Sequence, residues 1–390
     1  MEYYRHRYGV GGRLLEENKN AVPSESGETE PRHLTKPAQI ALLAAVCILS
    51  FLYSLGLLGA VGFVLMPLTA AMIVLLAVDL GDSKAGLTLL LFVNILPFAA
   101  SAIYTNSLPT ALGALYPLAT ALPIWLTVRT GQGRAASVAL AAMSLMVIML
   151  AGFAVSVVNE LGSFNAETVG MVLDAAFTPY GDYISGMTYE YNGETVNYFT
   201  AVDIDMMRYY FKAMFFGAAA AAMMVWAYFA TLAFRFVAWI FGTSWMIPYG
   251  YRISMRVKMT QNGPEAEISH EPVQWRIELD GVTVGIYISA YLISVLLSSS
   301  NGVLLTLYTV VMNLVIILSP GFLYCGVRDI ILGFRGKSSA GGMSRIVLIL
   351  GVIMLFINPM SMVFILCTLG VIVTLRENRA RRDLQKNRKE

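Results

Sequence analysis

Long uninterrupted apolar blocks, separated by short polar stretches, make up most of the chain. Blocks such as 38–58 and 136–158 reach the roughly 20 apolar residues that a helix needs to cross about 30 Å of hydrocarbon. Because a helix satisfies its own backbone hydrogen bonds inside lipid, the pattern predicts an all-α polytopic membrane protein. The expected helices lie near residues 38–57, 60–80, 85–104, 109–129, 136–158, 207–234, 281–298 and 302–326.

The last apolar block, 346–375, is too long for one ordinary crossing. As a single helix it would extend about 45 Å. Asn358 and Pro359 lie near its middle, where proline removes a backbone donor and favours a break. We predict two short spans folded at this pair, with one long tilted helix as the alternative. The chain then has about eight to ten transmembrane helices.

Composition supports a membrane protein and argues against a soluble domain, a disulfide-rich or thiolate-metal protein and a nucleic-acid-binding protein. Hydrophobic residues make up 57% of the chain and charged residues 13%, against about a quarter charged in a soluble domain. Cys47, Cys325 and Cys367 all lie within apolar blocks, so neither a disulfide framework nor a thiolate metal site is expected. The net charge is +2 without a basic groove, which argues against a nucleic-acid partner.

The placement of charge predicts the topology. With the expected spans, all Lys and Arg residues except Arg208 and Lys212 fall on one side of the bilayer, which the positive-inside rule makes cytoplasmic. The segment 160–205 holds eight Asp or Glu and no Lys or Arg, so it faces outward. Arg208 and Lys212 follow it and can pair with Asp203 and Asp205. The prediction is a multi-pass cell-membrane protein with both termini cytoplasmic.

This topology divides the chain into seven regions. The expected regions are a disordered cytoplasmic tail (1–37), a five-helix membrane region (38–158), an acidic extracytoplasmic loop (159–206), a long membrane helix (207–242), a cytoplasmic hairpin loop (243–280), C-terminal membrane helices (281–375) and a basic cytoplasmic tail (376–390).

An internal repeat links two stretches that lie 50 residues apart. The sequence LMPLTAAMIVLLAVDLGDSKAG from Leu65 aligns without a gap with LYPLATALPIWLTVRTGQGRAA from Leu115, and eight of 22 positions are identical. The matches include Pro67 with Pro117, and Lys84 faces Arg134. Two helical hairpins running in the same direction are therefore expected. Such repeats are common in transporters, which favours binding or transport over scaffolding alone.

The sequence carries no recognisable catalytic or energising apparatus, and we expect neither enzyme activity nor a cofactor. The central portions of the spans hold essentially no ionisable residue, which disfavours ion-coupled transport. Asp79, Arg129, Arg235, Arg328 and Asp329 lie near cytoplasmic helix ends, where snorkelling explains them. Neither HExxH nor GxxxxGK[ST] occurs, so any uphill transport draws its energy from another subunit.

Amides and tyrosines are the candidate ligand contacts. Asn94 and Asn313 are expected at membrane depth, where they either contact a polar ligand or form an interhelical hydrogen bond. Tyr104 and Asn106 are expected near the outer face, where they either line a mouth or anchor the helix at the interface.

Two hairpins are predicted outside the membrane. Asn192 and Gly193 lie between runs rich in Tyr, Thr and Val, a strong signal for a β-hairpin, which could cover an external cavity. Inside, residues 252–259 alternate polar and apolar before a turn at 262–264 leads into an acidic run. This second hairpin is either a docking element for a partner or a solvated excursion.

The repeated PL…V..G…[KR]A ends, the helix layout and the closing run NPMSMVFILCTLGVIVTLRENRARR resemble the YybS-like bacterial membrane proteins, a family of unknown function. That family is considered similar to substrate-binding S components of energy-coupling-factor transporters. The resemblance implies that small residues of the first helix, here Ala41 and Ala45, contact a membrane coupling subunit served by ATPases.

Two functions follow as hypotheses. The first is a substrate-capturing subunit for a small molecule, energised by partner subunits. The alternative is a non-transporting scaffold or regulator that acts through its tails and the cytoplasmic hairpin.

Overall fold

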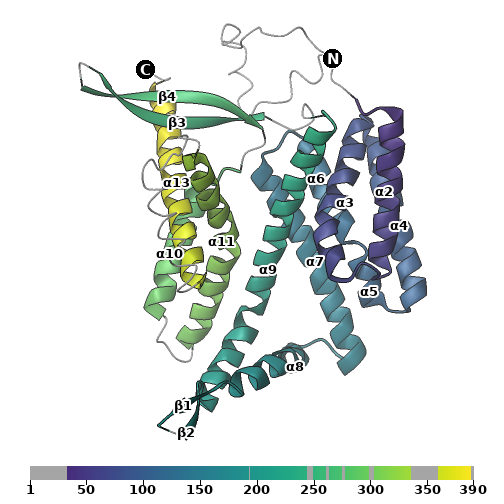
Figure 1. The fold of residues 1–390 in the computed structure, drawn as a ribbon, viewed down its shortest axis with the longest axis vertical. Helices are drawn as coiled ribbons and strands as arrows, with labels where there is room; N and C mark the ends of the chain where they lie inside the picture. Colours follow the sequence, from purple (N-terminus) through teal and green to yellow (C-terminus); the bar gives the residue numbers. More distant parts are fainter. Residues whose placement is uncertain are drawn as a thin grey trace.

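A bundle of membrane helices with two small β-hairpins makes up the fold (Figure 1). The computed structural model describes residues 33–192, 194–243, 249–260, 263–274, 277–297, 303–334 and 359–387. Its helices are α2 Lys36–Ser54, α3 Gly59–Asp79, α4 Ser83–Thr105, α5 Leu108–Gly113, α6 Tyr116–Arg129, α7 Arg134–Leu161, α8 Ala166–Ser185, α9 Ala201–Ile240, α10 Gly281–Leu297, α11 Val303–Phe334 and α13 Pro359–Asn387.

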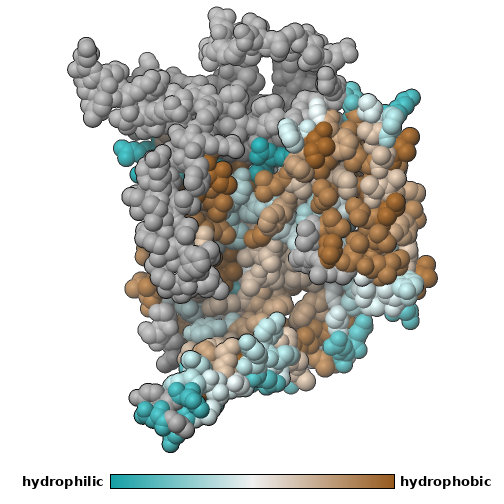
Figure 2. All heavy atoms as spheres, viewed as in Figure 1, coloured by the Kyte–Doolittle hydropathy of each residue, from teal (hydrophilic) through white to brown (hydrophobic). Residues whose placement is uncertain are grey.

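The apolar helices make the chain a multi-pass membrane protein. Among the described residues, six helical segments are long and apolar enough to cross a bilayer, and Leu65–Asp79 and Gly281–Leu297 are shorter apolar helices. Their outward faces carry large apolar side chains such as Ile48 and Phe92. In Figure 2 these faces form a hydrophobic band with hydrophilic residues at both ends. Such a band is the surface that a bilayer covers.

Each of the eight predicted spans coincides with a helix, and the all-α membrane class is confirmed. The span predicted at 109–129 is broken at Ala114–Leu115 into α5 and α6, because Pro117 favours a new helix start. Helix α13 is described from Pro359, and residues 335–358 lie outside the described part of the chain. Neither the predicted break at Asn358 and Pro359 nor the first of the two predicted spans is therefore tested.

Two faces of the molecule differ in charge. The basic face is the end of the bundle that carries Lys84, Arg129 and Arg235, and the acidic face is the opposite end, which carries Glu160 and Glu167. In Figure 1 the basic face is uppermost, with the start of α2 and the end of α13, and the acidic face lies at the bottom.

Each face also carries one of the predicted hairpins. On the acidic face, β1 Thr188–Tyr191 pairs with β2 Glu194–Asn197, and Asn192 adopts the left-handed φ of 52° that a tight turn needs. On the basic face, β3 Tyr249–Thr260 pairs with β4 Gly263–Gln274. The antiparallel register places Arg252, Arg256 and Lys258 opposite Glu271, Glu267 and Glu265. Both hairpins are confirmed.

The acidic segment 159–206 differs from the loop that the sequence predicts. It contains α8, a 20-residue helix, in addition to the hairpin. The Asn165 side chain accepts hydrogen bonds from the backbone N–H groups of Glu167 and Thr168, and the Thr168 hydroxyl accepts one from the N–H of Asn165. This capping box satisfies the free donors of the first turn and fixes the start of the helix.

The internal repeat appears in the backbone as well as in the sequence. The hairpin α2–α3 corresponds to α4 followed by α5 and α6. Gly56 and Asn106, 50 residues apart, both adopt a left-handed φ at the turns on the acidic face, of 70° and 47°. Gly81 and Gly131 do so at the turns on the basic face, with φ of 69° and 67°. The matched turns place both hairpins in the same direction across the membrane.

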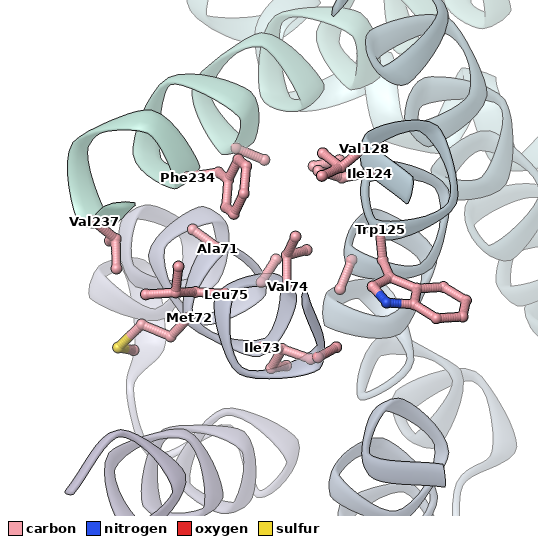
Figure 3. Packing of buried hydrophobic residues seen from close by; sticks show 14 of the residues in the cluster. Ala71, Met72, Ile73, Val74, Leu75, Ile124, Trp125, Val128, Phe234 and Val237 are labelled. Carbon is pink, nitrogen blue, oxygen red and sulfur yellow. The ribbon is translucent and has the colours of Figure 1, made fainter. Parts of the chain in front are cut away.

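The largest core cluster joins the two repeats to α9. Buried residues of α3 pack between α6 and α9, and most are less than a tenth exposed. Figure 3 shows Ala71, Met72, Ile73, Val74 and Leu75 of α3 with Ile124, Trp125 and Val128 of α6 and Phe234 and Val237 of α9. Because α9 also contacts α11, it connects this cluster to the C-terminal helices.

The C-terminal helices α11 and α13 pack against each other through small residues. A Cβ atom added to Gly370 would overlap the carbonyl oxygen of Phe322, and one added to Gly326 would overlap that of Leu366. Glycine lets two membrane helices approach this closely, and the contact resembles the small-residue interfaces of membrane helix pairs.

Candidate functional site

A cleft between α8 and α9 is the best candidate site on the acidic face. Its volume is about 730 Å³, within the range of small-molecule sites. Both helices contribute residues at spacings i, i+3, i+4 and i+7, so each presents one continuous stripe. The lining residues are Phe164, Asn165, Ala166, Val169, Gly170 and Leu173 on one side and Tyr209, Lys212, Ala213 and Phe216 on the other.

The placement of α8 creates the cleft. The helix lies across the bundle axis at the acidic end, as Figure 1 shows, instead of running parallel to the spans. Gly162 ends α7 with a left-handed φ of 75°, a conformation that glycine adopts without strain, and this turns the chain into α8. The far half of α8 is held to α9 by packing of Phe177 against Phe211, with ring centroids 5.6 Å apart.

One ion pair lies beside the cleft. The Lys212 Nζ atom is 2.9 Å from Oδ1 and 3.0 Å from Oδ2 of Asp174, so α9 and α8 are joined through these two side chains. Both are accessible to solvent, with 35% of the lysine side chain and 44% of the aspartate side chain exposed. The sequence suggested Asp203 and Asp205 as partners. Arg208 lies 3.7 Å from Asp205, whereas Lys212 pairs with Asp174 instead.

The two predicted amides lie in different helices, and each is fixed by a backbone carbonyl. Asn94 in α4 is 1% exposed and donates to the carbonyl of Leu90 in its own helix at 2.7 Å. Asn313 in α11 donates to the carbonyl of Ala213 in α9 at 2.8 Å, which is an interhelical hydrogen bond. Its Oδ1 atom packs against Gly217 and, like that of Asn94, accepts no hydrogen bond in the described structure.

Asn313 nevertheless lies close to the cleft, because Ala213, to which it donates, is one of the lining residues. Tyr104 and Asn106 lie away from it, at the end of α4 on the acidic face. Tyr104 is 73% exposed, and Asn106 ends the helix in a left-handed conformation. The four predicted ligand residues therefore do not form one site in this structure.

Ala41 and Ala45 lie on α2, the helix that the resemblance assigns to partner contact. Ala41 is exposed and Ala45 is half-buried, and they are flanked by the exposed side chains of Ile40 and Ile48. This stripe faces away from the bundle, so a second membrane helix can reach it.

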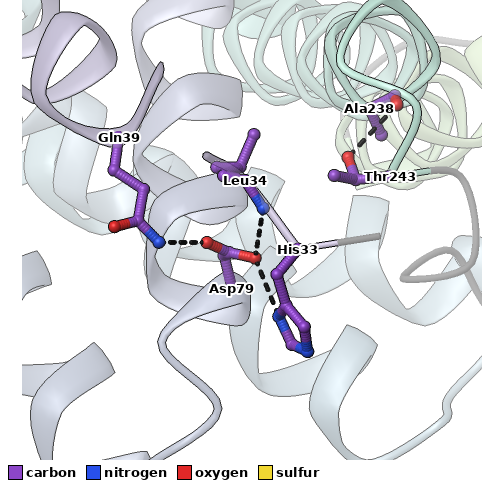
Figure 4. Close-up of polar contacts among 6 residues, drawn as sticks. All are labelled: His33, Leu34, Gln39, Asp79, Ala238 and Thr243. Atoms are coloured by element: carbon purple, nitrogen blue, oxygen red, sulfur yellow. Dashed lines mark hydrogen bonds and ion pairs between the residues drawn. The ribbon is translucent and has the colours of Figure 1, made fainter. Parts of the chain in front are cut away.

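The basic face carries buried charges that the sequence analysis read as snorkelling side chains. Asp79 is only 6% exposed. Its carboxylate accepts hydrogen bonds from the backbone N–H of Leu34 at 3.1 Å and from Nε2 of Gln39 at 2.6 Å, and Nδ1 of His33 lies 3.2 Å away (Figure 4). Asp79 therefore fixes the chain entering α2 against the end of α3, and snorkelling is the wrong interpretation for it.

Two further charges are corrected in the same way. Arg328 donates to the carboxylate of Glu377 at 2.7 Å and to the carbonyl of Ile277 at 3.1 Å, which joins α11 to α13 and to the segment before α10. Its neighbour Asp329 is fully buried. Charged groups that leave water need such partners, which the apolar pattern of a single helix does not reveal.

Arg134 is a buried cation that the sequence analysis did not single out. It is fully buried at the start of α7, although its counterpart in the first repeat, Lys84, is exposed. Nε donates to the hydroxyl of Thr231 at 2.9 Å and Nη1 to the hydroxyl of Tyr324 at 2.9 Å. The guanidinium also lies over the Tyr324 ring, 5.2 Å from its centroid. In the alignment of the two repeats, arginine at 134 stands where the first copy has Lys84. This difference was the signal in the sequence that could have pointed to the buried site.

The Arg134 cluster joins three helices, because Tyr324 in α11 also stacks on Tyr228 in α9 at 5.3 Å. With Arg134 fully buried, the cluster acts as a packing element of the basic face. Within the described residues, no group of three or more His, Cys, Asp or Glu side chains could hold a metal ion.

The cleft is thus the candidate site, with α8 as the element that sequence reasoning missed. The Asn165–Thr168 capping box and the cation Lys212 after a long acidic segment were the signals that could have located it. Comparisons with protein-family models, curated proteins and solved structures find no match to this chain.

Proposed function

We propose that this membrane protein is a substrate-binding subunit that captures a small molecule on its acidic face and depends on partner subunits for energy. The observation that carries the proposal is the cleft between α8 and α9, which is large enough for a small ligand and opens on the face opposite the buried ion pairs. Sites of this kind combine an apolar wall with a few polar groups, here Lys212, Tyr209 and Asn165.

The dependence on partners rests on the sequence and on α2. The chain has no P-loop, so it cannot couple ATP hydrolysis to uptake by that motif. Ala41 and Ala45 form an outward stripe of small residues on which a coupling subunit can pack a helix closely. We place the basic face in the cytoplasm, where ATPases would act, by the positive-inside rule.

Native mass spectrometry of protein purified from its own membrane tests ligand capture. We expect a retained small molecule on the wild-type protein and its loss from Leu173→Trp, because the larger ring fills the cleft. Leu140→Trp, at an exposed position on α7, is the control and should keep the ligand. Wild-type protein that never carries a small molecule, although it is folded, would contradict the proposal.

Co-purification tests the partner. Ala41→Leu combined with Ala45→Leu should remove a membrane coupling subunit and its ATPases from the purified complex, since the larger side chains block close helix approach. Ala139→Leu, on the exposed face of α7, is the matched control. If the wild-type protein brings down no such subunit, the energised-uptake part of the proposal fails.

A scaffold or regulator is the second candidate, and the β3–β4 hairpin favours it. Its 12-residue strands extend beyond the helices on the basic face, as Figure 1 shows. A two-stranded hairpin without further packing is marginally stable in water, and β3 contacts α13 within the bundle, so the part of the hairpin beyond α13 gains from a partner. Deletion of residues 249–274 should then disrupt assembly with that partner while ligand capture at the cleft persists. Unchanged assembly would reject this function.

A further inference from the structure

We infer that the cleft between α8 and α9 takes an amphiphile drawn from the bilayer, with one apolar chain and one anionic head group. This inference rests on the proposed function for the site but goes further, because it names the chemical class of the ligand. The ligand's chain lies along the apolar stripes of the two helices, and its head group binds Lys212.

The wall of the cleft is apolar over most of its length. Phe164, Val169, Leu173 and Phe216 supply the large side chains, and Ala166, Gly170 and Ala213 leave space between them. Gly170 has no atom within 4 Å of the position that its Cβ would occupy, so the groove is open there. An alkyl chain can lie along such a surface and keep the van der Waals contacts that it has among lipid chains.

The charged residue that lines the cleft is a cation, although its surroundings are acidic. Lys212 is the only charged residue among those that line it, and the nearby hydroxyl of Tyr209 and amide of Asn165 are neutral. Segment 160–205 around it carries eight acidic residues and no basic one. A cationic ligand would be drawn to the acidic surface in general, whereas only an anionic group is selected by this lysine.

Asp174 acts as an internal competitor for the same lysine. It is not a lining residue, but its carboxylate oxygens lie 2.9 and 3.0 Å from Nζ of Lys212. Because both side chains are about a third or more exposed, the pair is weak and the ligand's anion can displace the carboxylate. The ion pair then keeps the lysine neutralised when the cleft is empty.

The position of α8 matches the depth at which an amphiphile lies. The helix crosses the bundle axis at the acidic end of the apolar band, as expected for a helix in the interface plane (Figures 1 and 2). A bilayer amphiphile holds its charged head at this level and its chain in the hydrocarbon. It can therefore enter the cleft from the membrane without passing through water.

Equilibrium binding of a matched set of ligands tests the inference. The full-length protein in nanodiscs is titrated with radiolabelled dodecanoate, dodecanol and dodecylammonium at about pH 8, with empty nanodiscs correcting for partition. We expect dodecanoate to bind about tenfold more tightly than dodecanol, as a hydrogen bond to a charged group implies, and dodecylammonium most weakly.

Two variants should shift this preference in opposite directions. Lys212→Gln should make dodecanoate and dodecanol bind equally, while Asp174→Asn should tighten dodecanoate several-fold by removing the competitor. Lys84→Gln, on the exposed basic face, should change neither affinity. Equal binding of the three ligands to the wild type, or shifts of the same sign in both variants, would overturn the inference.

The outcome is separable from that of the proposed function. If dodecanoate binds as expected but no coupling subunit co-purifies, the cleft is an amphiphile site and the uptake role fails. If a retained small molecule is found by mass spectrometry but dodecanoate does not displace it, ligand capture stands and the amphiphile class is rejected.

Discussion

At the scale of single residues, the structure differs from the expectation from sequence mainly in the charges that are buried at the basic face. Lys84 and Arg134 occupy the same position in the two repeats, yet the first is exposed and the second fully buried. The planar guanidinium suits the buried position, because it donates to Thr231 and Tyr324 in fixed directions while lying over an aromatic ring. The same position of the repeat is therefore a surface cation in one copy and a packing element in the other.

This difference predicts unequal effects for the two cations. Arg134→Ala should lower the free energy of unfolding by about 3 kcal/mol, because it leaves a cavity and removes the donors to buried polar groups. Lys84→Ala should change it by no more than about 0.5 kcal/mol, as for an exposed residue. Chemical denaturation in lipid-detergent micelles measures both. An Arg134→Ala protein as stable as the wild type would contradict this, because the desolvation penalty of the guanidinium would then equal the stabilisation from its contacts.

At the scale of elements, glycines determine how closely the C-terminal helices pack. Gly370 in α13 meets the backbone of Phe322 in α11 with no room for a Cβ atom, whereas Gly285 in α10 has nothing within 4 Å of its Cβ position. Both are helical, so the two sites differ in packing and not in backbone conformation.

Alanine at these two sites should have opposite effects. Gly370→Ala is expected to destabilise the protein by about 1–3 kcal/mol, since two helix backbones must separate to admit the methyl group. Gly285→Ala is expected to stabilise it by up to about 1 kcal/mol through helix propensity. Melting temperatures in nanodiscs measure both effects, and we expect a lower value for Gly370→Ala and a higher one for Gly285→Ala than for the wild type. Equal shifts would contradict the close contact between α11 and α13.

Most helices and both hairpins are predicted well from the sequence. Uninterrupted apolar blocks mark eight helices and the Asn192–Gly193 and 262–264 turn signals mark both hairpins, because these features depend on local composition. Helix α8 is missed, since only one side of it is apolar and Pro179 and Gly181 interrupt its pattern. The cleft and the Arg134 cluster depend on contacts between distant segments, which no local pattern contains.

At the scale of the whole molecule, the charge asymmetry and the repeat describe one topology. The start of α2 and the end of α13 share the basic face, while α8 and the β1–β2 hairpin lie on the acidic face (Figure 1). The matched left-handed residues, two at turns on the acidic face and two at turns on the basic face, make the first two hairpins equivalent in direction.

Vesicle labelling tests this topology. In a background with Cys47, Cys325 and Cys367 replaced by alanine, a single cysteine is placed at Thr195 or at Lys84, both exposed. A membrane-impermeant thiol reagent should label Thr195→Cys only in right-side-out vesicles and Lys84→Cys only in inverted ones. Labelling of both from the same side would exclude the arrangement.

The Arg134 cluster also constrains the order in which the chain can assemble during synthesis. Thr231 and Tyr324 follow Arg134 by 97 and 190 residues, so neither exists when α7 emerges from the ribosome. Until α9 and α11 are inserted, the guanidinium must keep its hydration at the end of α7, beside the aqueous phase. Its withdrawal into the bundle is therefore a late step, completed only when the second half of the protein docks on the first.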